Sequence, residues 1–390
     1  MAETTDLDKQ IEQLPSSAIQ ANRKLLWDHI NECYIGHEGL WNFTEDCASF
    51  QHNEPDPNIA AIVEDKEYLK SHFTSHLPCL LNGSDYDVIT YEGHAMLVGR
   101  SKSGIVLCGQ SKSNARDRIS SENEDTRVER EHQTQMETSQ QLFAIKMIKC
   151  KDQLKEEEMD LESLAAFLKI LNEFSFQEKS HNTLKNSACI CRVPKPIGFL
   201  CLKTSSKSKK YLRYMIVSEF CGILPDVAIG LDLNAALNFD NHKNSILSKS
   251  EWKDVILALI DAVELFHKND IYHKDLKPEN IMLQFYDEGK SVFPSIIDFG
   301  LATDSKWFGD LQGDPNKYKY IDPVLFQEKG KPLPTSDLYS LAYTIRLICK
   351  KLQLHALKKE MKNYMKLKPT ERPGHQVFRK IVENHFDEKK

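Results

Sequence analysis

The stretch from Ile271 to Ala302 constrains the fold and chemistry of this chain more than any other part of its 390 residues. Its polar side chains come in a fixed order, with short apolar runs around an intervening turn: Asp275, Lys277, Asn280 and Asp298. Phosphoryl transfer from a nucleotide needs these side-chain types, because a carboxylate must orient the attacking hydroxyl, a cation must offset charge, and oxygen atoms must hold Mg²⁺. The order therefore indicates nucleotide-dependent phosphotransfer.

The same stretch contains two recognisable motifs. Residues 273–280 read HKDLKPEN and residues 298–300 read DFG. In this order and spacing they resemble the catalytic loop and the DFG motif of eukaryotic protein kinases, and the resemblance covers about residues 87 to 385. It implies an α+β, two-lobed protein-kinase-like fold with an N-lobe antiparallel sheet plus helix, a mostly helical C-lobe, and ATP with Mg²⁺ in the cleft.

The resemblance also implies roles for these residues. Asp275 would orient the substrate hydroxyl, Lys277 would offset charge on the γ-phosphoryl group, and Asn280 and Asp298 would ligate Mg²⁺ through oxygen. His273 is expected to be a packed, structural histidine. The DLKPEN order resembles serine/threonine kinases more than tyrosine kinases, so protein serine and threonine hydroxyls are the expected acceptors.

Composition narrows the classes of protein to which the chain can belong. The chain is 41% hydrophobic and 28% charged with a net charge of −6, whereas a general nucleic-acid binder is usually basic. The sequence contains no run of about eighteen apolar residues, so a membrane-spanning helix is not expected. Ten cysteines lack a repeating spacing and the start resembles no secretion signal, which favours reduced thiols and a cytoplasmic location, with a nuclear one as the alternative. The sequence does not determine the oligomeric state.

The first strands carry a candidate phosphate loop. Residues 88–100 and 101–110 are expected to form a hairpin whose turn resembles G-x-G-x-x-G-x-V, with Gly99, Ser101, Gly104 and Val106 at its positions. Serine replaces the middle glycine, where backbone N–H groups must approach phosphate oxygens closely. Residues 111–140 are polar and densely charged, so they predict a disordered insertion between strands.

The next strand carries a candidate nucleotide lysine. Phe-Ala-Ile-Lys at 143–146 resembles the kinase V-A-I-K motif, which assigns Ala144 and Lys146 to the ATP site. The family lysine pairs with a helix glutamate. A helix is expected over residues 152–174, where we choose Glu162, sixteen positions after Lys146, and keep Glu158 as the competitor.

The segment that joins the two lobes is expected at residues 219–222. By the same resemblance, backbone groups of Glu219 and Cys221 would bind adenine, and Ser218 would be a small gatekeeper that leaves an open pocket behind it. Further on, Ser248 and Glu251 form a possible capping box for a long amphipathic helix that leads to His273.

The activation segment departs from the family pattern. Residues 320–324 read YIDPV at the A-P-E position, without the glutamate. Arg372 resembles the arginine that normally pairs with that glutamate, and Glu328 is one candidate for its partner. Lys317 stands where serine/threonine kinases place a threonine that bonds the catalytic aspartate. Asp337 is expected to begin a buried helix and to bind the catalytic-loop backbone.

The sequence is expected to divide into two parts. Residues 1–86 form an N-terminal extension, expected to be partly helical, and residues 87–390 form the kinase-like domain, with an N-lobe at 87–220 and a C-lobe at 221–390.

Three functions remain open on the sequence alone. The expected activity is ATP- and Mg²⁺-dependent phosphorylation of protein serine or threonine. The alternatives are a pseudokinase scaffold and a kinase of small molecules.

Overall fold

A computed structural model describes fourteen stretches of the chain, which are residues 81, 86–91, 94–95, 97–100, 104–111, 142–148, 154–155, 161–206, 209–221, 229–238, 246–286, 291–305, 314–326 and 332–387. Their contacts divide the chain into two compact units. The sheet unit contains the described residues of Tyr34–Ser175 and Lys195–Phe220, and the helical unit contains those of Phe176–Pro194 and Cys221–Lys390. The expected extension lies outside the described residues except for Leu81 and Tyr86, and so does the insertion expected over 111–140 except for Ser111, which ends β5.

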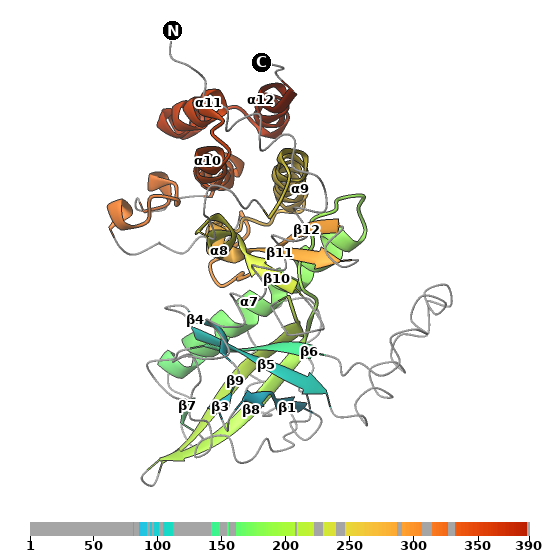
Figure 1. Cartoon of the computed structure of the whole chain (residues 1–390). Coiled ribbons are helices and arrows are strands. Elements are labelled where there is room, and N and C mark those ends of the chain that lie inside the picture. Colours follow the sequence, from blue (N-terminus) through green and yellow to red (C-terminus); the bar gives the residue numbers. More distant parts are fainter. Residues whose placement is uncertain are drawn as a thin grey trace. The chain divides into compact units, whose positions relative to one another are not determined.

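The sheet unit is built on one antiparallel sheet in the order β1-β5-β6-β9-β7, with β4 paired to β5 and β8 paired to β9 (Figure 1). Its strands are β1 Tyr86–Val88, β4 Leu97–Arg100, β5 Gly104–Ser111, β6 Leu142–Ile148, β7 Leu154–Lys155, β8 Pro196–Ser206 and β9 Lys209–Glu219. A separate two-stranded ladder joins β2 Thr90–Tyr91 to β3 His94–Ala95. The hairpin expected around the phosphate loop is confirmed, because Gly99 on β4 pairs with Val106 on β5.

Buried and half-buried side chains alternate along strand β6, which gives the sheet one apolar face. On β6 the side chains of Phe143, Ile145 and Met147 are buried, while Ala144 and Lys146 between them are half-buried on the opposite face. The buried face packs with neighbouring strands into an apolar core: Tyr86, Ile105, Leu107, Leu200, Met215 and Val217. Burial of one face thereby fixes which way Lys146 points.

Helix α7 Leu161–Lys185 begins nine residues later than the sequence predicts and continues eleven residues further. The leucines that predict the helix, Leu161, Leu164, Leu168 and Leu171, all belong to α7. Within residues 152–160 the structure describes only Leu154 and Lys155, which form strand β7 paired with β9. From Ile170 onward, where side chains are described, Ile170, Leu171 and Phe174 are buried, and Phe174 contacts Phe199 of β8 edge-on.

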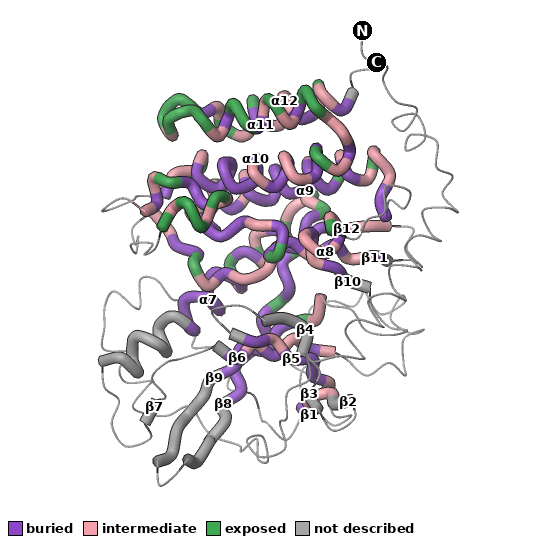
Figure 2. The backbone as a smooth tube through the Cα atoms, turned by 60° about the vertical axis from the view of Figure 1, so that its left-hand side comes forward, coloured by how far each residue is buried: buried purple, intermediate pink, exposed green. Residues whose placement is uncertain are grey.

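The helical unit combines four helices of twelve or more residues with a three-stranded sheet and short turns of helix. Its elements are β10 Ile229–Asp232, α8 Leu233–Asn238, α9 Lys249–Lys268, η3 Pro278–Asn280, β11 Ile281–Tyr286, β12 Ser291–Ile296, η4 Pro315–Lys317, η5 Pro323–Phe326, α10 Pro334–Lys351, α11 His355–Lys366, η6 Pro369–Glu371 and α12 His375–Asp387. Helix α10 packs against α9 and α11, and α12 packs against α9. Figure 2 shows α10 as mostly buried and α11 with an exposed side.

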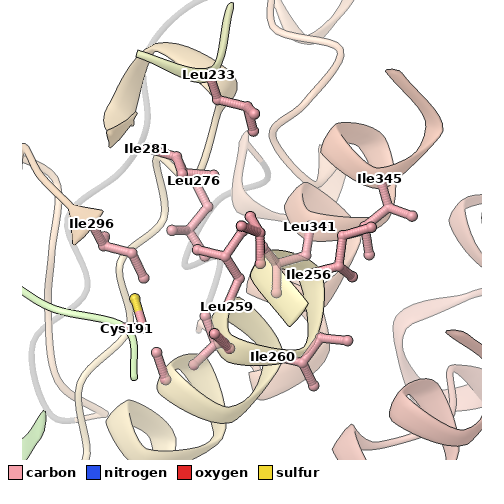
Figure 3. Close-up of a cluster of buried hydrophobic side chains, with 14 of the residues drawn as sticks. Cys191, Leu233, Ile256, Leu259, Ile260, Leu276, Ile281, Ile296, Leu341 and Ile345 are labelled. Carbon is pink, nitrogen blue, oxygen red and sulfur yellow. The ribbon is translucent and has the colours of Figure 1, made fainter. Parts of the chain in front are cut away.

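The predicted capping box of α9 is confirmed. The Ser248 hydroxyl accepts the Glu251 N–H at 3.2 Å, and the Glu251 carboxylate accepts the Ser248 N–H at 2.7 Å. One face of α9 is then buried through Trp252, Ile256 and Leu259, among others. This face meets Leu341 and Ile345 of α10 in the apolar cluster of Figure 3. Among the described residues, no helix is both long and apolar enough to cross a bilayer.

Candidate active site

The β11–β12 hairpin brings two distant parts of the helical unit together. Ile281 at the start of β11 pairs with Ile296 at the end of β12. Asn280, just before β11, therefore lies beside the residues that follow β12, and its carbonyl accepts the Ile297 N–H at 3.0 Å. Asp298 is the next residue. Antiparallel pairing thus places Asn280 and Asp298, eighteen residues apart in sequence, at one end of the same hairpin.

A buried network surrounds the Asp275 carboxylate. Its Oδ2 accepts hydrogen bonds from Lys277 Nζ and from Asn280 Nδ2, both at 2.8 Å. Asn280 Nδ2 also donates to the Asp275 carbonyl at 2.9 Å. Because both amide hydrogens of Asn280 point to Asp275, the amide oxygen is the atom that faces elsewhere. Three of the four polar residues that the sequence singles out are therefore in direct contact.

The catalytic loop, residues 273–280, is anchored from both sides. Leu276 points into the apolar cluster of Figure 3, between Ile281 and helix α9. On the polar side, Asp337 of α10 accepts the backbone N–H of His273 at 2.9 Å and that of Lys274 at 2.8 Å. Lys274 has φ 65°, a conformation that an L-residue adopts at a cost. The predicted contact of Asp337 with the loop backbone is confirmed, and it compensates for that cost.

Two histidines support this anchor. His267 Nε2 lies 2.9 Å from Asp337 Oδ2, and its Nδ1 lies 2.9 Å from Nε2 of His375 on α12. Burial raises the pKa of Asp337, but its interactions with His267, His273 and the Lys274 N–H together outweigh burial and lower that pKa overall. Burial lowers the pKa of His273, which packs on Phe299 with ring centroids 4.8 Å apart. His273 is therefore a packed neutral histidine, as the sequence predicts.

The sheet unit contributes an ion pair between Lys146 of β6 and Glu173 of α7, both largely buried. This corrects the choice of Glu162 from sequence. Glu173 lies 173 − 162 = 11 residues after Glu162, or about three helical turns, so the two positions share a face. The face was predictable, but the place along the helix depends on how α7 packs against β6, which spacing alone does not give. The side chain of Glu162 and residue Glu158 lie outside what the structure describes.

Of the other predicted ATP-site residues, Gly99, Gly104, Val106, Ala144 and Glu219 lie on strands of the same sheet, and Cys221 belongs to the helical unit. Gly104 begins β5, and Val106 lies opposite Lys146 on β6; Ser101 falls outside the described residues. At the end of β9, the Glu219 N–H donates to the Lys195 carbonyl at 2.9 Å, and the Glu219 carboxylate accepts the Lys195 N–H at 2.8 Å. The Glu219 N–H is thus already bonded within the sheet unit.

The activation segment contains an ion pair that the sequence did not reveal. Arg372 binds both oxygens of Asp322, with Nη1 2.5 Å from Oδ2 and Nη2 3.1 Å from Oδ1. Ser336 Oγ adds a third bond to Asp322 at 2.9 Å, and all three side chains are buried. Asp322, and not the candidate Glu328, is therefore the described partner of Arg372. The acid stands before Pro323 where the family pattern has one after the proline.

Tyr320 was not assigned a role from sequence, yet its ring lies against the catalytic loop, with Lys277 Nζ 5.4 Å from the ring centroid. Lys317, at the threonine position, is exposed. Sequence could have pointed to Tyr320 through one signal, because it is one of two hydroxyl-bearing residues shortly before Pro323.

A sheet unit with a lysine–glutamate pair and a helical unit with this loop are the parts of a two-lobed, α+β protein-kinase fold. The chain matches the protein kinase domain over residues 132–385, and it belongs to the protein kinase family. Strands β1 to β5 precede the matched range.

Curated relatives agree with this family. Serine/threonine-protein kinase ksp1 of Schizosaccharomyces pombe is 34% identical over 133 residues, 33% of this chain and 26% of that protein. Serine/threonine-protein kinase PknA of Nostoc is 36% identical over 109 residues, 26% of this chain and 18% of that protein. A third relative is the membrane-associated tyrosine- and threonine-specific cdc2-inhibitory kinase wee-1.3 of Caenorhabditis elegans, 32% identical over 28% of this chain and 15% of that protein. The chain spans less than a third of the length of each.

Proposed function

We propose that this chain is an active protein kinase that transfers the γ-phosphoryl group of ATP to serine or threonine hydroxyls of a protein. The observation that supports it most is the buried carboxylate of Asp275, held by Lys277 and Asn280. Carboxylates are rarely buried without a reason, because removing a charge from water is costly. A carboxylate held in this way is suited to orient an attacking hydroxyl and to receive its proton.

The remaining residues receive roles that match their chemistry. We assign Lys277, whose ammonium lies 2.8 Å from Asp275, to charge on the γ-phosphoryl group as it moves. Lys146 is assigned to the α- and β-phosphates, with Glu173 holding its ammonium in place. The backbones of Gly99, Ser101, Gly104 and Val106 are assigned to the phosphates, and Ala144, Glu219 and Cys221 to adenine.

The donor atoms near the β11–β12 hairpin suit Mg²⁺. Asn280 keeps its amide oxygen away from Asp275, and Asp298 supplies a carboxylate at the same end of the hairpin, just after β12. Hard divalent cations prefer such oxygen donors. Bound there, Mg²⁺ would offset phosphate charge. The orientation of the Asn280 amide is fixed by the protein, since Asp275 accepts both of its hydrogens.

A pseudokinase is the second candidate, and Ser101 in place of the middle glycine favours it. The missing A-P-E glutamate does not, because Asp322 takes over the pairing with Arg372 in a buried, bidentate bond. Retention of Lys146, Asp275 and Asn280 in bonded arrangements also supports an active enzyme. The names of two relatives support serine/threonine acceptors, and that of wee-1.3 includes tyrosine.

ATP, a protein substrate, a cytoplasmic or nuclear location, and a kinase domain at 87–390 complete the proposal. A transfer assay on the full chain tests it, with Mg²⁺, labelled ATP and separate serine/threonine protein, tyrosine polymer and metabolite acceptors. We expect label on serine and threonine of protein, and none with Lys146→Met. Calorimetry measures MgATP binding in parallel.

Each other outcome identifies a rival. Binding of MgATP without transfer to any acceptor would make the chain a pseudokinase, and transfer to metabolites alone would make it a small-molecule kinase. Failure to bind MgATP would overturn the assignment of the ATP-binding residues and of the Mg²⁺ ligands.

A further inference from the structure

Residues 372–375, which lead into helix α12, contact two segments of the proposed active site. Arg372, three residues before α12 begins, binds Asp322 of the activation segment. His375, the first residue of α12, lies against His267 in the last turn of α9. The start of α12 is therefore connected to the activation segment on one side and to the support of the catalytic loop on the other.

A continuous series of hydrogen bonds runs from His375 to the catalytic loop. His375 Nε2 lies 2.9 Å from His267 Nδ1, and His267 Nε2 lies 2.9 Å from Asp337 Oδ2. Asp337 in turn accepts the backbone N–H groups of His273 and Lys274. All of these residues belong to the helical unit. The position of α12 thus bears directly on the loop that carries the proposed catalytic residues.

The contact with His375 restricts the orientation of the His267 ring. The side chains of His267 and Asp337 are 4% and 2% exposed, and Tyr272 stacks on the His267 ring with centroids 5.2 Å apart. An imidazole that is bonded through only one nitrogen can still turn about that bond, and a bond at the second nitrogen removes this freedom. His375 supplies the bond at the second nitrogen.

The carboxylate of Asp337 determines which hydrogens the two rings need. An ionised carboxylate only accepts, so His267 Nε2 must carry a hydrogen. When His267 is neutral, its Nδ1 accepts and His375 Nε2 donates. When His267 is protonated, its Nδ1 donates and His375 Nε2 accepts. Because an imidazole at position 375 can do either, the bond between His267 and Asp337 is kept in both states.

His375 itself is neutral at neutral pH. Burial, and after it the charge of His267, lower the pKa of His375 to about 4. The other charged groups that act on it are Glu264 and Lys268 of α9 and Asp337 of α10. A neutral imidazole has one nitrogen with a hydrogen and one without, which is the form that can serve as donor or acceptor to His267.

We propose that His375 is a positioning residue for phosphoryl transfer, which holds the His267 ring so that its Nε2–H points to Asp337 and Asp337 keeps the catalytic loop in place. This inference rests on the proposed function. The loop needs such support, because Lys274 has φ 65°, a conformation that is costly for an L-residue. A small displacement of reacting groups, even one that originates far from the chemistry, lowers the rate of an enzyme substantially.

Kinetics of the full chain, measured well below the melting temperature of each variant, test the contact. His375→Met removes the hydrogen bonding and is expected to lower kcat about tenfold, with the KM for ATP within about twofold of wild type. His375→Gln is the conservative variant, because an amide can donate or accept, and it should keep kcat within about threefold. His355→Met, at an exposed histidine that begins α11, is the matched control and should not change kcat.

Two kinetic results overturn the inference. An unchanged kcat in His375→Met would show that the catalytic loop does not need the contact. A loss in His375→Gln as large as the loss in His375→Met would show that hydrogen bonding to His267 is not what matters at this position.

A magnetic-resonance measurement separates this inference from the proposed function, because it needs no turnover. In chains with ¹⁵N-labelled histidine, the His267 Nε2–H should exchange slowly with water in wild type and in His375→Gln, and rapidly in His375→Met. If wild type transfers no phosphate, the proposed function fails, while rapid exchange confined to His375→Met still supports the positioning contact. Equal exchange in all three chains overturns the inference, whether or not the chain is active.

Discussion

The catalytic loop and the Lys146–Glu173 pair show two ways of fixing a functional side chain. In the loop, Asp275, Lys277 and Asn280 lie within six residues, and one turn of chain brings them into contact. The lysine pair joins residues 27 positions apart, on a strand and a helix. Short-range contacts can be derived from spacing, whereas long-range contacts depend on where each element begins. The comparison predicts different sensitivities in the two regions.

The largest expected effect is on Asp275. Asp275→Asn keeps the size of the side chain but removes the proton acceptor, so we expect transfer to fall by about 10³- to 10⁴-fold while MgATP binding is retained. Single-turnover kinetics and calorimetry measure the two quantities separately. Glu279→Gln, an exposed acid of the same loop, is the control and should stay near wild type. Equal losses in both variants would contradict a special role for the buried acid.

The next effect concerns the long-range pair Asp322–Arg372. Arg372→Ala leaves a buried carboxylate without its cation, which costs about 3–5 kcal/mol. Equilibrium urea unfolding measures this change in the free energy of unfolding. Lys368→Ala breaks the pair Lys368–Glu371, whose side chains are 80% and 55% exposed, and should cost less than about 1 kcal/mol. If both variants unfold alike, the Asp322–Arg372 pair does not stabilise the fold.

A smaller effect tests the corrected helix glutamate. Glu173→Gln should lower transfer by about 10²-fold, because a lysine that loses its partner misplaces the phosphates that it binds. Glu162→Gln, on the same face three turns earlier, should have little effect. The KM for ATP and kcat are measured for both, and a loss confined to Glu162→Gln would restore the original choice.

The smallest effect is on pH dependence. Burial, followed by the nearby His267, lowers the pKa of His375 to about 4, against an ordinary value of 6.5. Since the folded chain then takes up the proton later than the unfolded chain, stability should fall as pH drops from about 6.5 to 4. The loss should be about 1–2 kcal/mol, allowing for partial exposure. Thermal unfolding at several pH values measures it.

The groups around His375 oppose one another, since Glu264 and Asp337 favour its charged form and Lys268 disfavours it. His375→Gln should flatten the pH dependence, and the exposed His355→Gln should leave it unchanged. Parallel pH profiles for His375→Gln and wild type would show that His375 does not control stability.

Sequence predicted the fold class, the capping box of α9, the hairpin around the phosphate loop and the anchoring of the loop by Asp337. Each of these follows from a local pattern or from a motif with fixed spacing. It failed for Glu173 and Asp322 for one reason. Helix face is set by a period of 3.6 residues, but which turn of α7 meets Lys146 depends on how the helix packs on the sheet, and Arg372 meets Asp322 from fifty residues away in the chain. Neither of these long-range contacts can be derived from a short stretch of sequence.

The buried pair Asp322–Arg372 also bears on how divergent members of this family are sorted. A comparison of motif residues alone would record a lost glutamate at residues 320–324 and would group the chain with the inactive members of the family. The negative charge has instead been relocated to the other side of Pro323, where the same arginine reaches it with two bonds. Whether a divergent motif has lost its structural role is better judged by whether each charged side chain keeps a partner of opposite charge than by the residue type at one motif position.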